Sequence, residues 1–204
     1  HNVLFLFDSI TRFAEAHRET ALMAGETPAL NAFPPSTVRV ISELAERAGP
    51  GLDDKGDITA IYSVLVAGSD MEEPVADMIR GILDGHIILS RQIAERQRYP
   101  AIDVLRSVSR ALPHAATDEE NTLIRRCRRT LALYEELEPM LRANLYEFGK
   151  DAEGDNAIAL FPALDKFMGT KNQDGIDSAF QTLNTILGPD ASSAPPEPPP
   201  TSED

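Results

Sequence analysis

The sequence predicts an α/β layer with a mostly parallel sheet, followed by a small all-helical domain. Two apolar runs, Val3 to Phe7 and Ile58 to Val66, alternate with segments of helical periodicity. Beyond Pro113 the pattern is helical, with glycine-containing breaks. A chain of 204 residues, 42% of them hydrophobic, is long enough for one core and a small second domain. We therefore expect an α/β domain over residues 1–113, a helical domain over 114–188 and an unfolded tail over 189–204.

The first strand, Val3 to Phe7, is a continuous apolar run, which is typical of a central parallel strand buried on both faces. Ser9 is placed to cap a helix over Thr11 to Met23, which Gly25 and a proline-rich stretch then end. Ser36 precedes a second helical pattern that runs through Glu46.

The run from Ile58 to Val66 is rich in β-branched residues and predicts a second buried strand. A helix through about Ile82, a short strand over His86 to Leu89 and a helix through Arg96 complete the predicted α/β part. From Asp118 to about Leu187 we expect helices, with breaks near 149–154 and 169–175. The segment 191–204 has too few apolar residues to fold.

Charge, cysteine content and hydropathy limit the classes of function. A net charge of −14 argues against nonspecific binding to nucleic acid or anionic lipid, because the summed field repels phosphate. Cys127 is the only cysteine and cannot form an internal disulfide, so a reducing, cytoplasmic compartment is expected. No segment approaches the length of a membrane span. Because the chain begins at His1 and enters an apolar strand almost at once, it is expected to be a fragment of a longer protein.

A carboxylate and an arginine follow the first predicted strand. Asp8 ends that strand, at the sheet edge where α/β proteins bind ligands. A carboxylate there can hold Mg²⁺ through water beside nucleotide phosphates, although many such residues only cap the next helix. Arg12 follows one helical turn later and suits a phosphate group. The alternative for Arg12 is a simple ion pair with Asp8.

Tyr99 and Arg110 flank the boundary between the predicted domains. Tyr99 is held extended by the following Pro100, which could present its ring for stacking on a base. Arg110 is predicted to lie in a loop between the two domains, where it could reach a neighbouring subunit. Composition alone leaves both as surface residues.

Seven blocks of sequence follow one another along the chain: DSITRFAEAHRETAL, FPPS, ERAG, GDITAIYSVLVAGSD, ILDGHIILSR, RYPAID and SVSR. In order and spacing these blocks resemble those of the rotary and protein-export ATPases. Over about residues 2–187 the chain is similar to the flagellum-specific protein-export ATPases, relatives of the F-type ATP synthase catalytic subunit and of the injectisome ATPases. The resemblance implies a partial RecA-like P-loop NTPase core and a helical C-terminal domain.

The resemblance also implies roles for the candidate residues, with ATP and Mg²⁺ as ligands. Asp8 matches the Walker B aspartate that orders Mg²⁺ and its waters, and Arg12 matches a phosphate-contacting arginine. Tyr99, with Pro100, matches the aromatic that packs against adenine. Arg110 matches the arginine finger, which enters the site of the adjacent subunit and can supply about 10³–10⁵ in rate.

The implied assembly is a homohexamer in the cytoplasm, peripheral to the inner-membrane export apparatus. Its implied partners are a central stalk protein, a regulatory subunit, the export gate, and export substrates with their chaperones. An arginine-rich stretch of the helical domain could contact such partners, or could be a solvated, salt-bridged helix surface. That stretch consists of Arg125, Arg126, Arg128 and Arg129. Tyr146 and Phe148 are expected in the core, or else at the border of the adenine pocket.

The phosphate-binding motif of this family, G-x-x-x-x-G-K-[ST], does not occur in the 204 residues. Its amides and lysine position the phosphates, so we expect this chain alone not to hydrolyse ATP. Without the phosphate-loop strand and the strands before it, the sheet would have unpaired edges and exposed apolar faces. We therefore expect this chain alone to be poorly stable or to self-associate. An injectisome ATPase, a noncatalytic ring subunit and an inactive gene remnant stay open as alternatives.

Overall fold

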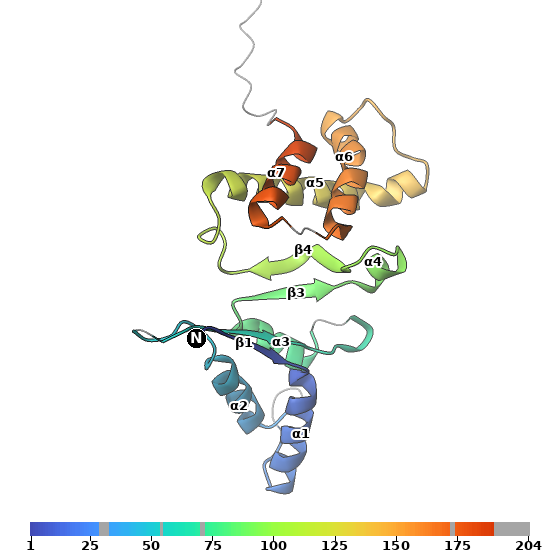
Figure 1. The fold of residues 1–204 in the computed structure, drawn as a ribbon. Helices are drawn as coiled ribbons and strands as arrows, with labels where there is room; N and C mark the ends of the chain where they lie inside the picture. The colour runs from blue at the N-terminus through green and yellow to red at the C-terminus, as the bar shows by residue number, and fades with distance from the viewer. Residues whose placement is uncertain (29–32, 54, 70–71, 172–173, 190–204) are drawn as a thin grey trace, which may run out of the picture. The chain divides into compact units, whose positions relative to one another are not determined.

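The computed structural model describes residues 1–28, 33–53, 55–69, 72–171 and 174–189 (Figure 1). The chain divides into two compact units, His1–His86 and Ile87–Asp204. The predicted tail over 189–204 lies outside the described residues except for Pro189. The predicted domain boundary at residue 113 stays a prediction.

The first unit combines a pair of parallel strands with three helices. Its elements are β1 (Val3–Phe7), α1 (Ile10–Met23), α2 (Pro35–Ala45), β2 (Ile58–Tyr62), a 3₁₀ turn (Ala67–Ser69) and α3 (Pro74–Ile82). The register of β1 and β2 pairs Val3 with Ile58 and Phe7 with Tyr62. The predicted alternation of strands and helices is confirmed. The second strand, however, ends at Tyr62 rather than Val66.

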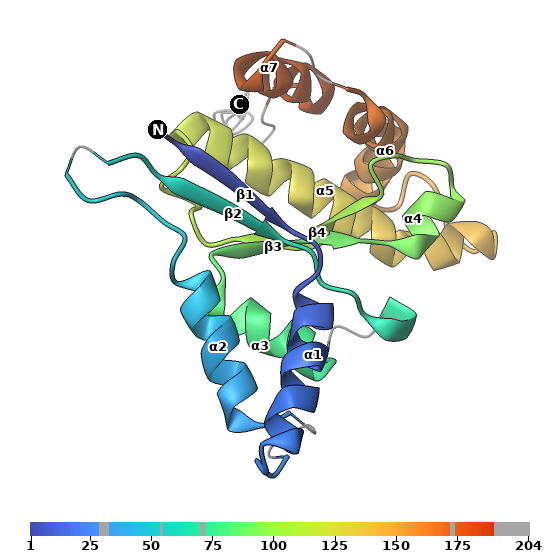
Figure 2. The ribbon, with the colours of Figure 1, turned by 60° about the horizontal axis from the view of Figure 1, so that its bottom comes forward.

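The core of the first unit lies between one face of the strands and the three helices. Figure 2 shows α1, α2 and α3 on the same side of the β1–β2 pair. Phe7 and Tyr62 pack from the strands against this core. Its buried residues are Ile10, Ala14, Ile41, Val75 and Ile79, and burying each of the larger side chains contributes about 1.5–3 kcal/mol.

The prediction that β1 is buried on both faces is wrong. Leu4 and Leu6 are 62% and 66% exposed, whereas Phe5 and Phe7 are partly buried. Successive side chains of a strand point to opposite faces, and the core cluster that α1, α2 and α3 supply lies on the phenylalanine side. An apolar run therefore identified the strand but not the number of layers that cover it.

Local capping rules explain where the first two helices begin. The Ser9 hydroxyl accepts a hydrogen bond from the backbone N–H of Arg12, so Ser9 caps α1 as predicted. The second helix begins at Pro35, with Pro34 at the capping position, so Ser36 lies inside the first turn rather than before it. Proline suits the first position of a helix, which Pro35 occupies, because the backbone N–H that proline lacks would have no partner within the helix.

The second unit contains a two-stranded sheet and a three-helix bundle. Its elements are β3 (Gly85–Leu89), which begins at the end of the first unit, α4 (Arg91–Glu95), β4 (Ile102–Ser109), α5 (Asp118–Arg142), α6 (Ala152–Gly169) and α7 (Ile176–Leu187). Figure 1 draws β3 and β4 side by side with their arrows in opposite directions. The strand β4 was not predicted, because the sequence analysis assigned no helix or strand between Arg96 and Pro113 and placed Arg110 in a loop.

The helices α5, α6 and α7 pack around a small apolar core. Val104 and Leu105 of β4 pack against the same core. Tyr134 of α5 stacks on Phe161 of α6, with ring centroids 3.5 Å apart and planes within 5° of parallel. The buried members of the core are Cys127, Leu131, Leu164, Leu183 and Leu187. No helix within the described ranges is long and apolar enough to cross a membrane.

Candidate functional site

Asp8 lies at the carboxyl edge of the parallel strand pair. It follows β1 directly, and Ser63 follows β2 at the same edge. The Ser63 hydroxyl donates a hydrogen bond of 2.5 Å to Oδ1 of Asp8. The carboxylate is exposed, yet a hydroxyl from the neighbouring strand fixes its orientation. This edge is where open α/β sheets bind ligands.

The turn between β1 and α1 is tied to the segment that leaves β2. The backbone N–H of Ile10 donates to the carbonyl of Ser63 at 3.0 Å. Thr11 Oγ1 donates to the carbonyl of Leu65 at 3.3 Å and accepts from the N–H of Leu65 at 2.9 Å. The backbone N–H of Ser63 still donates to the carbonyl of Phe7 at 3.0 Å, but Leu65 bonds to Thr11 rather than to a strand, which is the physical reason why β2 is shorter than predicted.

Ser63 is a site residue that the sequence analysis missed. The prediction placed it inside a strand running to Val66, where its side chain would lie against the sheet rather than at its edge. The sequence did contain a signal for Ser63, namely a hydroxyl residue near the end of a second predicted parallel strand. Because the carboxyl ends of parallel strands meet at one edge of a sheet, that residue could have been expected near Asp8.

Arg12 lies in the first turn of α1, and its side chain is exposed. Within the described part of the chain, Arg12 and Asp8 do not pair with each other, so the alternative of a simple ion pair is not observed. The N-terminal turn of a helix favours negative charge, and a guanidinium there adds to this preference. Asp8 and Arg12 thus belong to one strand–turn–helix segment.

The surroundings of Asp8 fit a hydrated divalent cation. Oδ1 accepts from Ser63, and among the described residues Oδ2 has no hydrogen-bond partner. Mg²⁺ keeps several of its waters and uses one or two carboxylates, so one oriented carboxylate with an open oxygen suits it. In the described ranges no group of three or more His, Cys, Asp or Glu side chains forms a cation site made by protein alone.

Tyr99 and Pro100 lie in the second unit, between α4 and β4. The Tyr99 side chain is 59% exposed. Arg98, the residue before Tyr99, anchors the backbone that follows Tyr99, since its Nη1 donates to the Pro100 carbonyl at 3.5 Å and its Nη2 to the Ile102 carbonyl at 3.0 Å. The exposed tyrosine ring is therefore carried by a fixed backbone.

Arg110 is the first residue after β4, and its side chain is exposed. Tyr99 and Arg110 lie at opposite ends of this eight-residue strand, which spans roughly 25 Å at the usual rise per residue. The structure does not bring Tyr99 and Arg110 together.

The arginine-rich stretch of α5 is only partly a solvated surface. Arg125 bonds to Thr122 of its own helix, and Arg129 pairs with Glu153 at 2.7 Å, both on the outside. Arg126 is different, because its Nη2 donates to the carbonyls of Leu187 and Gly188 at 3.0 Å each and so caps the end of α7. The surface interpretation is wrong for Arg126, whose partner lies about sixty residues away in sequence.

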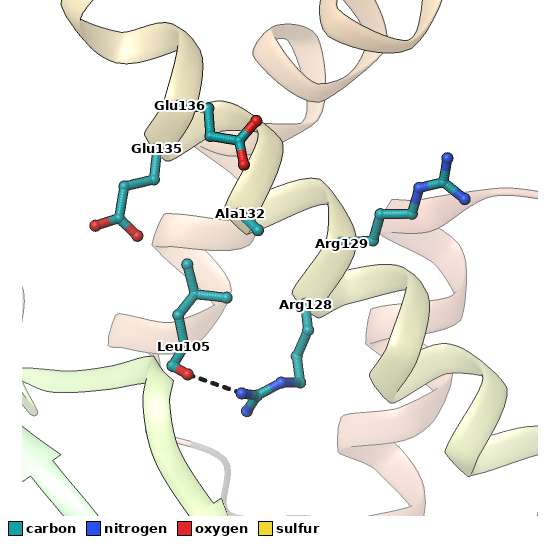
Figure 3. A pocket seen from close by; sticks show the side chains of 6 residues that line it. All are labelled: Leu105, Arg128, Arg129, Ala132, Glu135 and Glu136. Atoms are coloured by element: carbon teal, nitrogen blue, oxygen red, sulfur yellow. Dashed lines mark hydrogen bonds between the residues drawn. The ribbon is translucent and has the colours of Figure 1, made fainter.

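Arg128 also points away from solvent, toward β4. Its guanidinium donates to the carbonyls of Val104 and Leu105 at 2.6 and 2.8 Å. Figure 3 shows the bond between Arg128 and Leu105, which lies beside an open pocket of about 590 Å³ between α5 and the β4 segment. The lining residues are Leu105, Arg128, Arg129, Ala132, Glu135 and Glu136. This pocket mixes both charges and includes none of the predicted site residues.

The connection between α5 and α6 contains Tyr146 and Phe148. The Tyr146 hydroxyl donates to Oδ1 of Asp155 at 2.9 Å, and loss of solvation together with this carboxylate raises the pKa of Tyr146 to about 12. Phe148 is 68% exposed and touches Tyr146 edge-on. The core prediction is therefore wrong for Phe148, because this connection projects from the bundle.

Two family models match the chain. Residues 1–109 match the ATP synthase alpha/beta family, nucleotide-binding domain. Residues 116–185 match the T3SS EscN ATPase C-terminal domain. Together they cover nearly all of the residues that form the elements described above.

Individual proteins are similar over most of this chain but extend well beyond it. The flagellum-specific ATP synthase of Treponema pallidum is 45% identical over 91% of this chain and 40% of its own length. The SPI-2 type 3 secretion system ATPase of Salmonella typhimurium is 45% identical over 91% of this chain and 43% of its own length. The assembled ATPase EscN of enteropathogenic E. coli superposes with a TM-score of 0.84 at 36% identity, over 91% of this chain and 45% of EscN. The chain thus spans less than half the length of each.

Proposed function

This chain belongs to the flagellar and type III secretion ATPases of the ATP synthase alpha/beta family, and on that basis we propose that it is part of the ATP-hydrolysing subunit that energises flagellar protein export. ATP and Mg²⁺ are its proposed ligands. The proposed site residues are Asp8, Arg12, Tyr99, Pro100 and Arg110.

The observation that carries the proposal is the placement of Asp8. An exposed carboxylate, oriented by Ser63, lies at the carboxyl edge of a parallel strand pair. Bound Mg²⁺ would neutralise charge on the nucleotide phosphates, which is its contribution to phosphoryl transfer. Asp8 would hold the waters of that ion, and Arg12 in the next turn would contact a phosphate oxygen.

The distance between Tyr99 and Arg110 supports a ring of identical subunits. Residues at opposite ends of β4 cannot both contact one nucleotide, because the strand spans roughly 25 Å. We infer that Tyr99 packs against the adenine of its own subunit while Arg110 reaches the nucleotide of the next. EscN, whose assembled form has been solved, is the precedent for assembly, and it has also been solved with its central stalk EscO. A stalk protein is accordingly a proposed partner here.

Sequence identity does not distinguish a flagellar ATPase from an injectisome ATPase here. A flagellar relative and an SPI-2 relative are both 45% identical, and the EscN-type C-terminal model favours an injectisome ATPase as the second candidate. Complementation decides between them. If the full-length gene restores motility to a strain that lacks its flagellar ATPase but does not restore injectisome secretion, the flagellar assignment stands, and the reverse result assigns the injectisome.

The test of the ATPase proposal compares full-length protein with its Arg110→Ala variant. We expect Mg²⁺-dependent turnover from the parent and a loss of about 10³-fold or more in the variant, the range reported for such arginines. The 204 residues alone should show no turnover, because they contain no G-x-x-x-x-G-K-[ST] segment to hold the phosphates. An inactive parent, or an Arg110→Ala variant with full activity, would favour a noncatalytic ring subunit.

A further inference from the structure

We propose that Arg128 and Asn121 of α5 are positioning residues that hold the turn carrying Arg110. This inference rests on the proposed function, in which Arg110 completes the site of a neighbouring subunit. All of the groups involved lie in the second unit, within residues 88–128. What the structure adds is that one helix binds the chain on both sides of Arg110.

Arg128 holds the chain before Arg110. Its Nη1 donates to the carbonyls of Val104 and Ser107 at 2.6 and 3.3 Å, and its Nη2 donates to the carbonyl of Leu105 at 2.8 Å. One guanidinium thereby binds three backbone carbonyls of β4. Because the planar fork has a fixed geometry, it fixes the direction of the backbone as well as its distance from α5.

Ser107 extends this anchorage to β3. Its hydroxyl donates to the carbonyl of Asp103 at 2.5 Å and accepts from the N–H of Ile88 at 3.0 Å. The strand is thus bonded to α5 through Arg128 and to β3 through Ser107, three residues before Arg110. Little freedom remains at this end of the turn.

Asn121 holds the chain after Arg110. Its side chain is 7% exposed, and Nδ2 donates to the carbonyls of Pro113 and Ala116 at 2.8 and 3.1 Å. Removing this buried amide would cost free energy, because the Ala116 carbonyl would lose its side-chain donor and the Pro113 carbonyl would keep only the N–H of Ala116, at 3.2 Å. Asn121 lies seven residues before Arg128 on α5, two helical turns away, so both contacts come from neighbouring turns of a single rigid element.

The two contacts make the position of Arg110 depend on α5. A residue that must meet a phosphate across a subunit interface needs accurate placement, and an error of about 1 Å can cost on the order of 10²-fold in rate. Any shift of α5 would move the carbonyls on both sides of Arg110 together. The helical bundle therefore controls the reach of Arg110 into the adjacent site.

The experiment is a double-mutant cycle on full-length protein, with ATPase activity as the readout. Arg128→Gln should lower kcat by about 10–100-fold and leave KM within about twofold, since Arg128 does not touch the nucleotide. In the Arg110→Ala background the same change should lower kcat no further. A residue that only stabilises the fold would lower activity in both backgrounds.

Arg125→Gln and Arg129→Gln are the matched controls on the same helix. In the part of the chain that the structure describes, Arg125 bonds only within its helix and Arg129 pairs with Glu153, so both variants should keep the parent kcat. Hydrogen exchange of the peptide covering 102–116 should quicken in Arg128→Gln and in Asn121→Asp, and should stay unchanged in the controls. This readout does not depend on turnover.

The remaining outcomes of these experiments overturn either the inference or the proposed function. Full kcat in Arg128→Gln, or a further loss when it is combined with Arg110→Ala, would overturn the inference. If Arg128→Gln does not fold, Arg128→Lys keeps the charge but loses the fork, and full kcat in that variant would overturn it as well. An inactive parent, or an active Arg110→Ala variant, would remove the proposed function itself, which is a separate result.

Discussion

Arg98 and Asp165 form an ion pair of 2.9 Å in which the arginine is almost enclosed, at 9% exposure, while the aspartate is 43% exposed. The same guanidinium bonds to the carbonyl of Ile102, at the start of β4. One side chain therefore joins the segment that carries Tyr99 to α6. Asp165 and Arg98 thus connect the proposed adenine-binding turn to the helical bundle.

Replacing Arg98 by methionine should destabilise the protein by about 1–3 kcal/mol, because two backbone carbonyls lose their donor and Asp165 loses its partner. The variant should also bind nucleotide more weakly, since the Tyr99 backbone is no longer anchored. Urea unfolding and the affinity for a fluorescent ATP analogue are the measurements. Arg91→Met is the control, because Arg91 is 85% exposed and, among the described residues, pairs only with Glu95, a contact worth about 0.5 kcal/mol. An Arg98→Met variant as stable as Arg91→Met would contradict the prediction.

In the full-length protein, replacing Ser63 by alanine should lower kcat about tenfold, because Asp8 loses the hydrogen bond that orients it within the described part of the chain. The concentration of Mg²⁺ needed for half-maximal activity should rise as well. Steady-state turnover across a magnesium titration measures both effects. Ser42→Ala removes a hydroxyl that only bonds back to Val38 within α2, and it should leave both values unchanged. Unchanged magnesium dependence in Ser63→Ala would argue against Asp8 as the residue that holds the ion.

Replacing Arg126 by alanine should loosen the end of α7. The carbonyls of Leu187 and Gly188 lose the donor that caps them, which costs about 1–3 kcal/mol in stability. Amide hydrogen exchange should quicken in the last turn of α7 and remain slow in α6. Arg125→Ala, on the neighbouring exposed position, is the matched control. Equal exchange in the two variants would show that Arg126 contributes nothing to this helix end.

Cys127 should make the stability of the protein fall at alkaline pH. Burial raises the pKa of this thiol from 9.0 to about 11, although the charge of Arg128 partly opposes the shift. Between these two values the unfolded chain releases a proton that the folded chain keeps, so unfolding becomes more favourable as the pH rises. The contribution of the neutral thiol to the free energy of unfolding is fully present below pH 9.0 and is lost as the pH rises toward 11.

The measurement for Cys127 is urea unfolding at several pH values between 8 and 11 (about the range of the shift), for the wild type and for Cys127→Ala. The variant should lose this part of the pH dependence, whatever its absolute stability. Because tyrosines titrate in both proteins alike, only the difference between the two curves matters. Parallel curves would show that the thiol titrates as it does in the unfolded chain.

Local rules predicted the elements that depend on neighbours in sequence. Periodicity, capping residues and nearby glycine breaks predicted α1 with its Ser9 cap. The same local signals predicted the three helices beyond residue 117. The strand β1 was also recognised, with Asp8 at its end. These features need no knowledge of distant segments.

The contacts that connect distant segments could not be predicted in this way. The strand β4 mixes charged and apolar residues, and its carbonyls are satisfied by Arg128 from more than twenty residues away. Ser63 reaches Asp8 across fifty-five positions. Likewise, the exposure of Leu4 depends on which layers cover the sheet. Each of these depends on packing, which a single sequence does not display.

The stacked rings of Tyr134 and Phe161 give this protein a built-in optical reporter. The chain contains no tryptophan, so its near-ultraviolet circular dichroism comes from tyrosine and phenylalanine rings held in rigid, asymmetric surroundings. The coplanar pair joins α5 to α6 at 3.5 Å. A single Phe161→Trp substitution would place an indole against Tyr134, and its emission would then follow the separation of these two helices.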